Sequence, residues 1–135
     1  MIRYVAGVFL ILHGVVHLLY CGQSTRMFEL QPGMVWPDGS WAFSRLLGDD
    51  SARVVASVSL ILAALGLIGA GVAILFGHGW WRPIAIASLT LSSLLYAALW
   101  NGTIAQLANQ GAVGLAINLA ILIALLVFRW PRFAF

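Results

Sequence analysis

ARVVASVSLILAALGLIGAGVAILF, residues 52–76, is the stretch that decides the fold. Its single charged side chain is Arg53, close to its start. A helix needs about 20 apolar residues to cross a bilayer core about 30 Å thick, and this stretch is long enough. No alternation of period 2 runs through it, and a segment in lipid must satisfy its backbone polar groups internally. We therefore predict a transmembrane helix here.

Three other runs have the same character, at residues 4–21, 84–100 and 112–128. The chain is 62% hydrophobic and 8% charged, whereas a soluble domain carries about 25% charged residues. We predict an all-α integral membrane four-helix bundle, with residues 1–135 forming one transmembrane domain. No room is left for a separate soluble domain, so any site lies in the membrane, at its surface or in the long loop.

The placement of arginine predicts the orientation. Arg3, Arg82, Arg129 and Arg132 lie on one side of the predicted membrane, and the other three arginines share the opposite side with all four acids. Basic residues are enriched on the cytoplasmic side, so both termini are expected there. The chain contains arginine but no lysine, which suggests a bacterial genome. We therefore expect the protein in a bacterial inner membrane. The net charge of +3 is too scattered for nucleic acid. The expected partners are the bilayer and either a second copy or a larger membrane complex.

A long loop, residues 22–51, joins the first two predicted helices. Ser40 suits the cap of a short helix over residues 41–47, and Asp49 and Asp50 suit the start of the next helix. A solvated linker would not carry so many large apolar residues, and the loop therefore either anchors in the interface or forms a lid over a pocket. These apolar residues are Met27, Phe28, Leu30, Met34, Val35, Trp36, Trp41, Phe43, Leu46 and Leu47.

His13 and His17 stand out inside the first predicted helix. They are four residues apart and therefore share one face, which Tyr20 continues. Ionisable residues within a span are costly and usually face the bundle interior. Polar residues of the third and fourth predicted helices, including Ser93, lie at a comparable depth. We predict one outward-facing polar pocket that binds a ligand through His13, His17, Tyr20, Ser92, Tyr96 and Asn118.

Three interpretations of the histidine pair stay open: interhelical hydrogen bonding, a substrate or lipid pocket, and a metal or haem site. Two histidines at i and i+4 can hold an ion, but Gly14 stands where the zinc-helix motif has its glutamate. No metal ligands and no cofactor are assigned. We expect a protein that binds a small or lipid-soluble molecule, or an accessory subunit. The alternative is a membrane enzyme that uses His13 and His17 on a lipid-soluble substrate, or a metal- or haem-binding subunit.

Small residues recur along the second predicted helix at alternating spacings of four and three. In lipid, helices associate through close packing, which small residues permit. The first helix has a matching stripe formed by Gly7, Gly14 and Cys21, and the partner of the seam lies either in the same chain or in a second copy. The seam consists of Ala52, Ala56, Ser59, Ala63, Gly66, Ala70 and Ala73.

The segment LHGVVHL, residues 12–18, together with Trp80-Trp81 and Asn118, resembles a group of small bacterial four-helix membrane proteins. That group has an HGxxHL signature in its first helix and is mostly of unassigned function. The resemblance covers most of the chain and implies the four-helix topology without implying an activity. The loop at residues 22–51 is longer than the usual connection in that group. DoxX-like proteins are a more distant comparison, in architecture alone.

Overall fold

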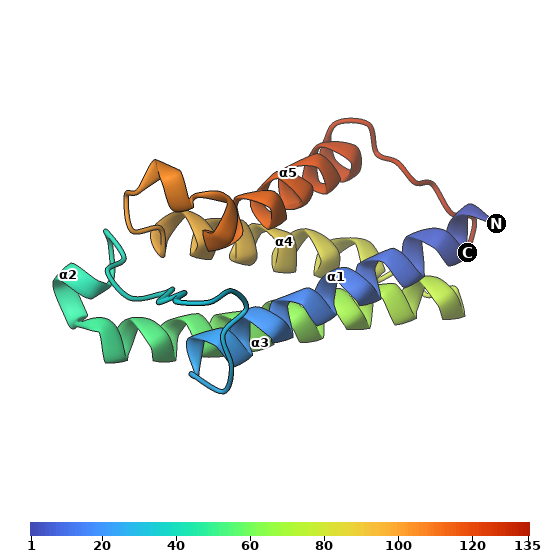
Figure 1. The fold of residues 1–135 in the computed structure, drawn as a ribbon. Helices are drawn as coiled ribbons and strands as arrows, with labels where there is room; N and C mark the ends of the chain where they lie inside the picture. The colour runs from blue at the N-terminus through green and yellow to red at the C-terminus, as the bar shows by residue number, and fades with distance from the viewer.

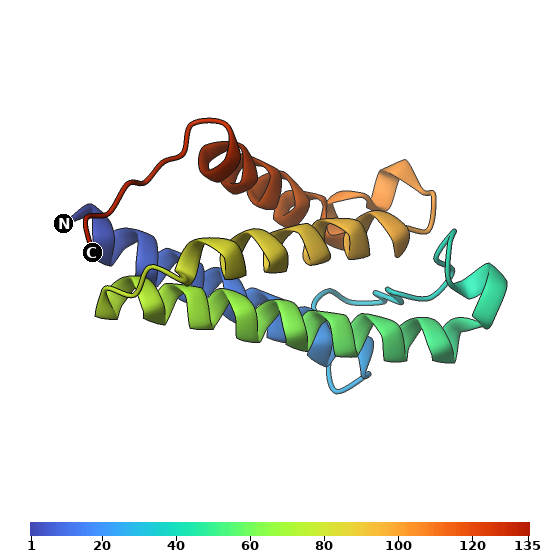
Figure 2. The same cartoon turned by 180° about the vertical axis from the view of Figure 1, so that it is seen from behind.

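The structure is a computed structural model that describes residues 1–135, and it is all-helical. Its long helices run in alternating directions, so that the two termini lie at the same end (Figure 1; Figure 2, from behind). They are α1 (Ile2–Ser24), α3 (Asp49–Phe76), α4 (Trp81–Ala98) and α5 (Val113–Leu126). The short helix α2 (Ser44–Leu47) lies in the long loop, and a 3-10 turn, η1 (Ile104–Gln106), and a π turn, η2 (Ala108–Ala112), precede α5.

Three helical segments are long and apolar enough to cross a membrane: Ile2–Ser24, Asp49–Phe76 and Ala108–Leu126. The fourth long helix, α4, has 18 residues and carries Arg82 and Pro83 in its first turn. The sequence analysis began this helix at residue 84, directly after Pro83. Proline is tolerated in a first turn because the backbone N–H groups there have no helical partner. Each predicted helix is present, with its ends displaced by at most three residues.

The helices α1 and α3 pack with their backbones in contact. A Cβ added to Gly7 of α1 would lie 3.0 Å from the carbonyl oxygen of Gly71 in α3. Two turns further along α1, a Cβ added to Gly14 would lie 3.0 Å from the carbonyl oxygen of Ala64. Larger residues at these glycines would force the two helices apart. The glycine stripe of α1 therefore forms a close helix–helix interface of the kind that associates in lipid.

The predicted seam of α3 is largely buried within this chain. Gly66, in the middle of the seam, faces the side chain of Ser88 in α4. The stripe of α1 packs instead against a separate stripe of α3 that contains Gly71. Small residues on α3 therefore serve two neighbouring helices. The seam residues without any exposed surface are Ala52, Ala56, Ala63, Ala70 and Ala73.

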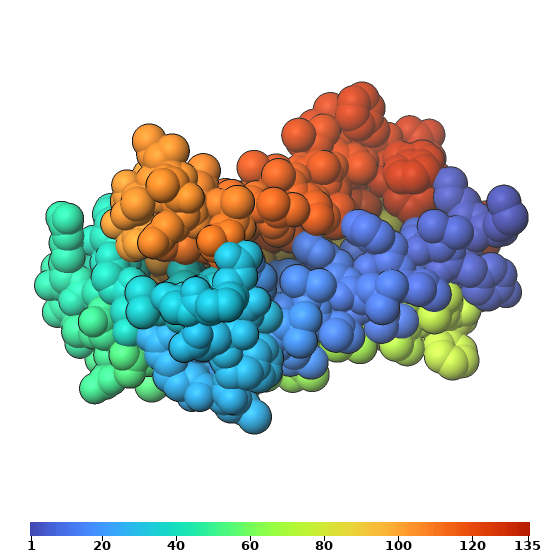
Figure 3. All heavy atoms as spheres, in the orientation of Figure 1, coloured from blue at the N-terminus to red at the C-terminus, as the bar shows by residue number.

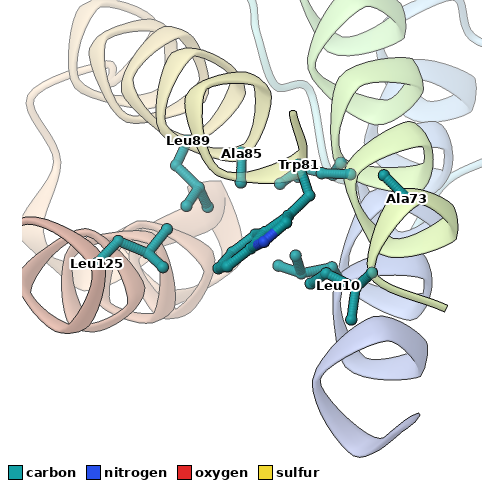
Figure 4. Close-up of a cluster of buried hydrophobic side chains, with 9 residues drawn as sticks. Leu10, Ala73, Trp81, Ala85, Leu89 and Leu125 are labelled. Carbon is teal, nitrogen blue, oxygen red and sulfur yellow. The ribbon is translucent and has the colours of Figure 1, made fainter. Parts of the chain in front are cut away.

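Two apolar clusters form the core, one at each end of the bundle. At the end near the termini, the indole of Trp81 reaches from the start of α4 into the space between Leu10 of α1 and Leu125 of α5 (Figure 4). At the opposite end, the long loop contributes Met34 and Trp36 to a cluster with residues of α3 and α4. The loop is therefore part of the fold and packs back onto the bundle, one of the arrangements that its apolar residues allow.

The side chain of Ser40 stabilises the turn before α2, whose N-cap residue is Phe43 and not Ser40 as predicted. Oγ of Ser40 accepts hydrogen bonds from the backbone N–H groups of Phe43 (3.1 Å) and Ser44 (2.8 Å). The helix is shorter than the predicted 41–47 because residues 41–43 form a turn. Asp49 and Asp50 lie in the first turn of α3, where negative charge meets the positive end of the helix dipole.

Candidate functional site

Both histidines of α1 point into the bundle, and their partners lie on two other helices. Nε2 of His13 is 2.6 Å from Oδ1 of Asn118 in α5, and Nε2 of His17 is 2.6 Å from Oγ of Ser92 in α4. The amide of Asn118 also donates to Oγ of Ser92, at 2.9 Å. None of the four side chains is more than 6% exposed. These four residues, called the polar cluster below, tie α1, α4 and α5 together.

The hydrogen-bond partners determine which ring nitrogens of the polar cluster carry hydrogen. Nδ1 of His17 is 2.8 Å from the carbonyl oxygen of His13, which can only accept, so Nδ1 is the donor. In an uncharged His17 ring Nε2 then accepts from the hydroxyl of Ser92. The hydroxyl oxygen accepts in turn from Asn118, whose Oδ1 accepts from Nε2–H of His13. With that ring the four bonds run in one direction around the cluster.

Two tyrosines extend the polar cluster toward the long loop. The ring of Tyr96 lies 6.0 Å from that of His17, and Tyr20 packs edge-on to Tyr96 with centroids 5.3 Å apart. Trp36 of the loop packs against both tyrosines, at 5.4 Å and 5.8 Å. Its side chain is only 2% exposed. The structure thus brings all six predicted site residues together, and Trp36 of the loop packs on the two tyrosines among them.

Two polar ties that hold the loop, of which only the one at Gln23 is buried, were missed in the sequence analysis. Gln23, at the end of α1, has no exposed surface and donates to the carbonyl oxygen of Met34, at 2.9 Å. Asp38 pairs with Arg26 and with Arg53, each at 2.6 Å. These contacts join the loop to the end of α1 and the start of α3. Nothing in the sequence distinguishes this glutamine and this aspartate from the other polar residues of the loop.

An apolar cavity of about 500 Å³ lies between α1 and α5, toward the end that holds the termini. The backbones of these two helices do not approach closely anywhere, and the chain leaves a hollow between them, called the crevice below. Figure 3 shows the face on which the blue atoms of α1 border the orange and red atoms of the C-terminal part. No charged residue lines the crevice, whose walls include Val5, Phe9, Ile117, Ala120, Ala124 and Trp130.

The crevice and the polar cluster adjoin each other. Phe9 lines the crevice, and its ring stacks parallel to that of His13 with centroids 6.1 Å apart. On the facing helix, Ile117 lines the crevice and directly precedes Asn118. The hydrogen bond between His13 and Asn118 therefore spans from α1 to α5 where the crevice ends. An elongated apolar molecule in the crevice would have the edge of the polar cluster at one end.

Hydrogen bonds, and no further His, Cys, Asp or Glu side chains, surround the two histidines. No three His, Cys, Asp or Glu side chains come together in a way that could hold a metal ion. Nε2 of His13 and Nε2 of His17, the ring atoms best placed as ligands, are occupied by Asn118 and Ser92. Comparison of the chain with protein-family models, with curated proteins and with solved structures finds no match.

Proposed function

We propose that this chain is a four-helix membrane protein that binds a lipid-soluble molecule in the crevice between α1 and α5. The observation that carries the proposal is the apolar cavity of about 500 Å³ between two helices whose backbones do not meet. Ligand pockets typically measure about 300–1,000 Å³ and are mostly apolar. In a bilayer such a space is adjacent to hydrocarbon chains, so its natural occupant is an apolar chain.

Packing supports α4 as the fourth span. This helix contacts α3 on one side and α5 on the other, and both of those lie in segments that can cross a membrane. Its buried Ser92 shares the polar cluster with residues of α1 and α5 and therefore lies at the same depth as they do. On α3, a run of large apolar side chains is exposed, as expected of a surface in lipid: Val54, Val58, Ile61, Leu62 and Leu65.

The proposed orientation places both termini in the cytoplasm and the long loop outside, in a bacterial inner membrane. Single cysteines at Asp50 and Gly79, in a Cys21→Ala background, test this with an impermeant thiol reagent on intact cells. Both positions are exposed, and no contact would crowd a Cβ at Gly79. We expect labelling of Asp50→Cys and none of Gly79→Cys until the cells are opened. The reverse pattern would contradict the orientation.

Native mass spectrometry of the protein after gentle detergent extraction tests the binding function. We expect retained molecules of lipid mass, and their loss from Ala120→Phe, because the added ring fills the crevice. The matched control is Ala116→Phe, an exposed alanine one turn away on α5 that does not line the crevice. The same spectra report the number of copies per particle, which distinguishes a lone chain from a homo-oligomer.

Absence of any retained molecule from the parent protein, in several mild detergents, would contradict the proposal. Equal retention by Ala120→Phe and by Ala116→Phe would place the bound molecule outside the crevice. Both variants are first compared with the parent in thermal unfolding, so that a folding defect is not mistaken for lost binding.

A further inference from the structure

The end of the bundle that holds the termini carries four arginines and no acid. All four acids of the chain lie in the long loop or in the first turn of α3, at the opposite end. Each of the four arginines is the immediate chain neighbour of a residue that lines the crevice. The pairs are Ile2 with Arg3, Trp81 with Arg82, Trp130 with Arg129, and Pro131 with Arg132.

These arginines differ in how many hydrogen bonds and ion pairs they form within the protein. Arg3 donates to two backbone carbonyl groups at the end of α3, so it is committed to the fold. Arg82 donates through Nη2 to the carbonyl oxygen of Pro131, at 3.3 Å, but its Nε is buried without a partner. Arg129 and Arg132 are exposed and form no ion pair, since the three ion pairs of the protein lie at the other end.

We infer that the molecule in the crevice is an anionic phospholipid, with a hydrocarbon chain against α1 and α5 and its phosphate at Arg82, Arg129 and Arg132. The inference rests on the proposed function of the crevice and names its ligand class. An arginine matches the oxygens of a phosphate in charge and in hydrogen-bond geometry. Basic groups beside a gap between membrane helices on the cytoplasmic side favour anionic headgroups.

Both parts of such a lipid find a complementary surface here. No charged residue lines the crevice, so its walls suit the hydrocarbon chain of the lipid. At its mouth, the arginines attract the phosphate, and no Asp or Glu side chain lies near them to offset their charge. A neutral lipid-soluble molecule would use the wall and leave the arginines without a role. Arginines should therefore control which lipid is bound, whereas crevice residues should control whether any lipid is bound.

The test compares phosphatidylglycerol with phosphatidylcholine of identical chains, titrated onto the delipidated full chain in detergent and followed by native mass spectrometry. We expect tighter binding of phosphatidylglycerol. The variant Arg129→Gln/Arg132→Gln should weaken it by about fivefold for each arginine removed, and leave phosphatidylcholine unchanged. The control Arg45→Gln removes an exposed arginine without an ion pair at the opposite end and should change neither lipid.

Equal affinity for the two lipids, or an unchanged preference in the double variant, would overturn the inference and leave the crevice as a chain-binding site. Failure of the parent protein to bind either lipid would overturn the inference and the proposed function together. Inorganic phosphate at millimolar concentration should not displace phosphatidylglycerol. Displacement by phosphate would assign the arginines to a free anion and would contradict the lipid assignment.

Discussion

The helix α1 has two apolar neighbours, and it meets them in opposite ways. Toward α3 its backbone is in contact, with Gly7 against Gly71 and Gly14 against Ala64. Toward α5 it leaves the crevice, and one hydrogen bond between side chains, from His13 to Asn118, joins the two helices. Both neighbouring faces are apolar, so hydrophobicity does not distinguish the tight interface from the open one.

The difference shows what makes helices associate in lipid. Hydrocarbon chains are as apolar as leucine, so burying an apolar face gains little, and close contact between backbones decides instead. Glycines on α1 permit that contact with α3. On the side toward α5, the side chains of Phe9, Ile117, Ala120 and Ile121 line the crevice and do not fill it. A polar hydrogen bond then supplies the connection that packing does not.

The largest effect is expected at the tight interface. Gly71→Leu should lower the free energy of unfolding by about 3 kcal/mol, because its Cβ alone would crowd the backbone of Gly7 and Ile11. The control is Gly69→Leu, two residues away on the same helix, where no atom lies within 4 Å of an added Cβ. Thermal and denaturant unfolding in mixed micelles measures both variants. Equal stability of the two would show that α1 and α3 are not closely packed.

A smaller effect is expected at the polar bridge. Asn118→Ala should lower the free energy of unfolding by about 2 kcal/mol, because the buried Nε2–H of His13 loses its acceptor. The control is Ser93→Ala, whose hydroxyl donates only to the carbonyl oxygen of Leu89 in its own helix. The variant His13→Phe/Asn118→Leu should recover part of the loss, since neither polar group is then left unpaired. Additive losses in that double variant would argue against a bridge.

The smallest effect is expected inside the crevice. Ala124→Leu should change the free energy of unfolding by no more than about 0.5 kcal/mol, because the added carbons enter open space. The same unfolding measurement applies, with Gly71→Leu as the contrasting variant. A loss near that of Gly71→Leu would mean that α1 and α5 close on each other in the membrane and that the crevice is filled by the protein itself.

Much of the secondary structure could be predicted from the sequence because it depends on local features. Apolar runs long enough to cross a bilayer predicted the long helices to within three residues of their ends. The apolar residues of the loop predicted that it packs onto the bundle or lies in the interface, and its Trp36 is buried against the bundle. The inward direction of His13 and His17 followed from the cost of placing an imidazole in lipid.

Only the tertiary structure decided how the helices are rotated against one another. The sequence analysis left the partner of the α3 seam open, and the structure shows that Gly66 of that seam faces α4 whereas Gly71 receives α1. The sequence analysis expected a pocket at the polar residues themselves, whereas the large apolar cavity lies beside them, toward the end that holds the termini. The polar residues were identified, but the space beside them was not.

The physical reason is that a bilayer, unlike water, is as apolar as the protein core, so hydrophobicity no longer distinguishes a buried face of a helix from an exposed one. In water, an apolar residue indicates the core and a polar residue the surface, so a helix shows which face is buried. In lipid, the sequence does not show whether an alanine such as Ala120 faces hydrocarbon, another helix or a crevice, because an apolar residue suits all three surroundings. The sequence by itself therefore determined the helices and their few costly polar groups, and packing in three dimensions decided which apolar faces close and which one stays open.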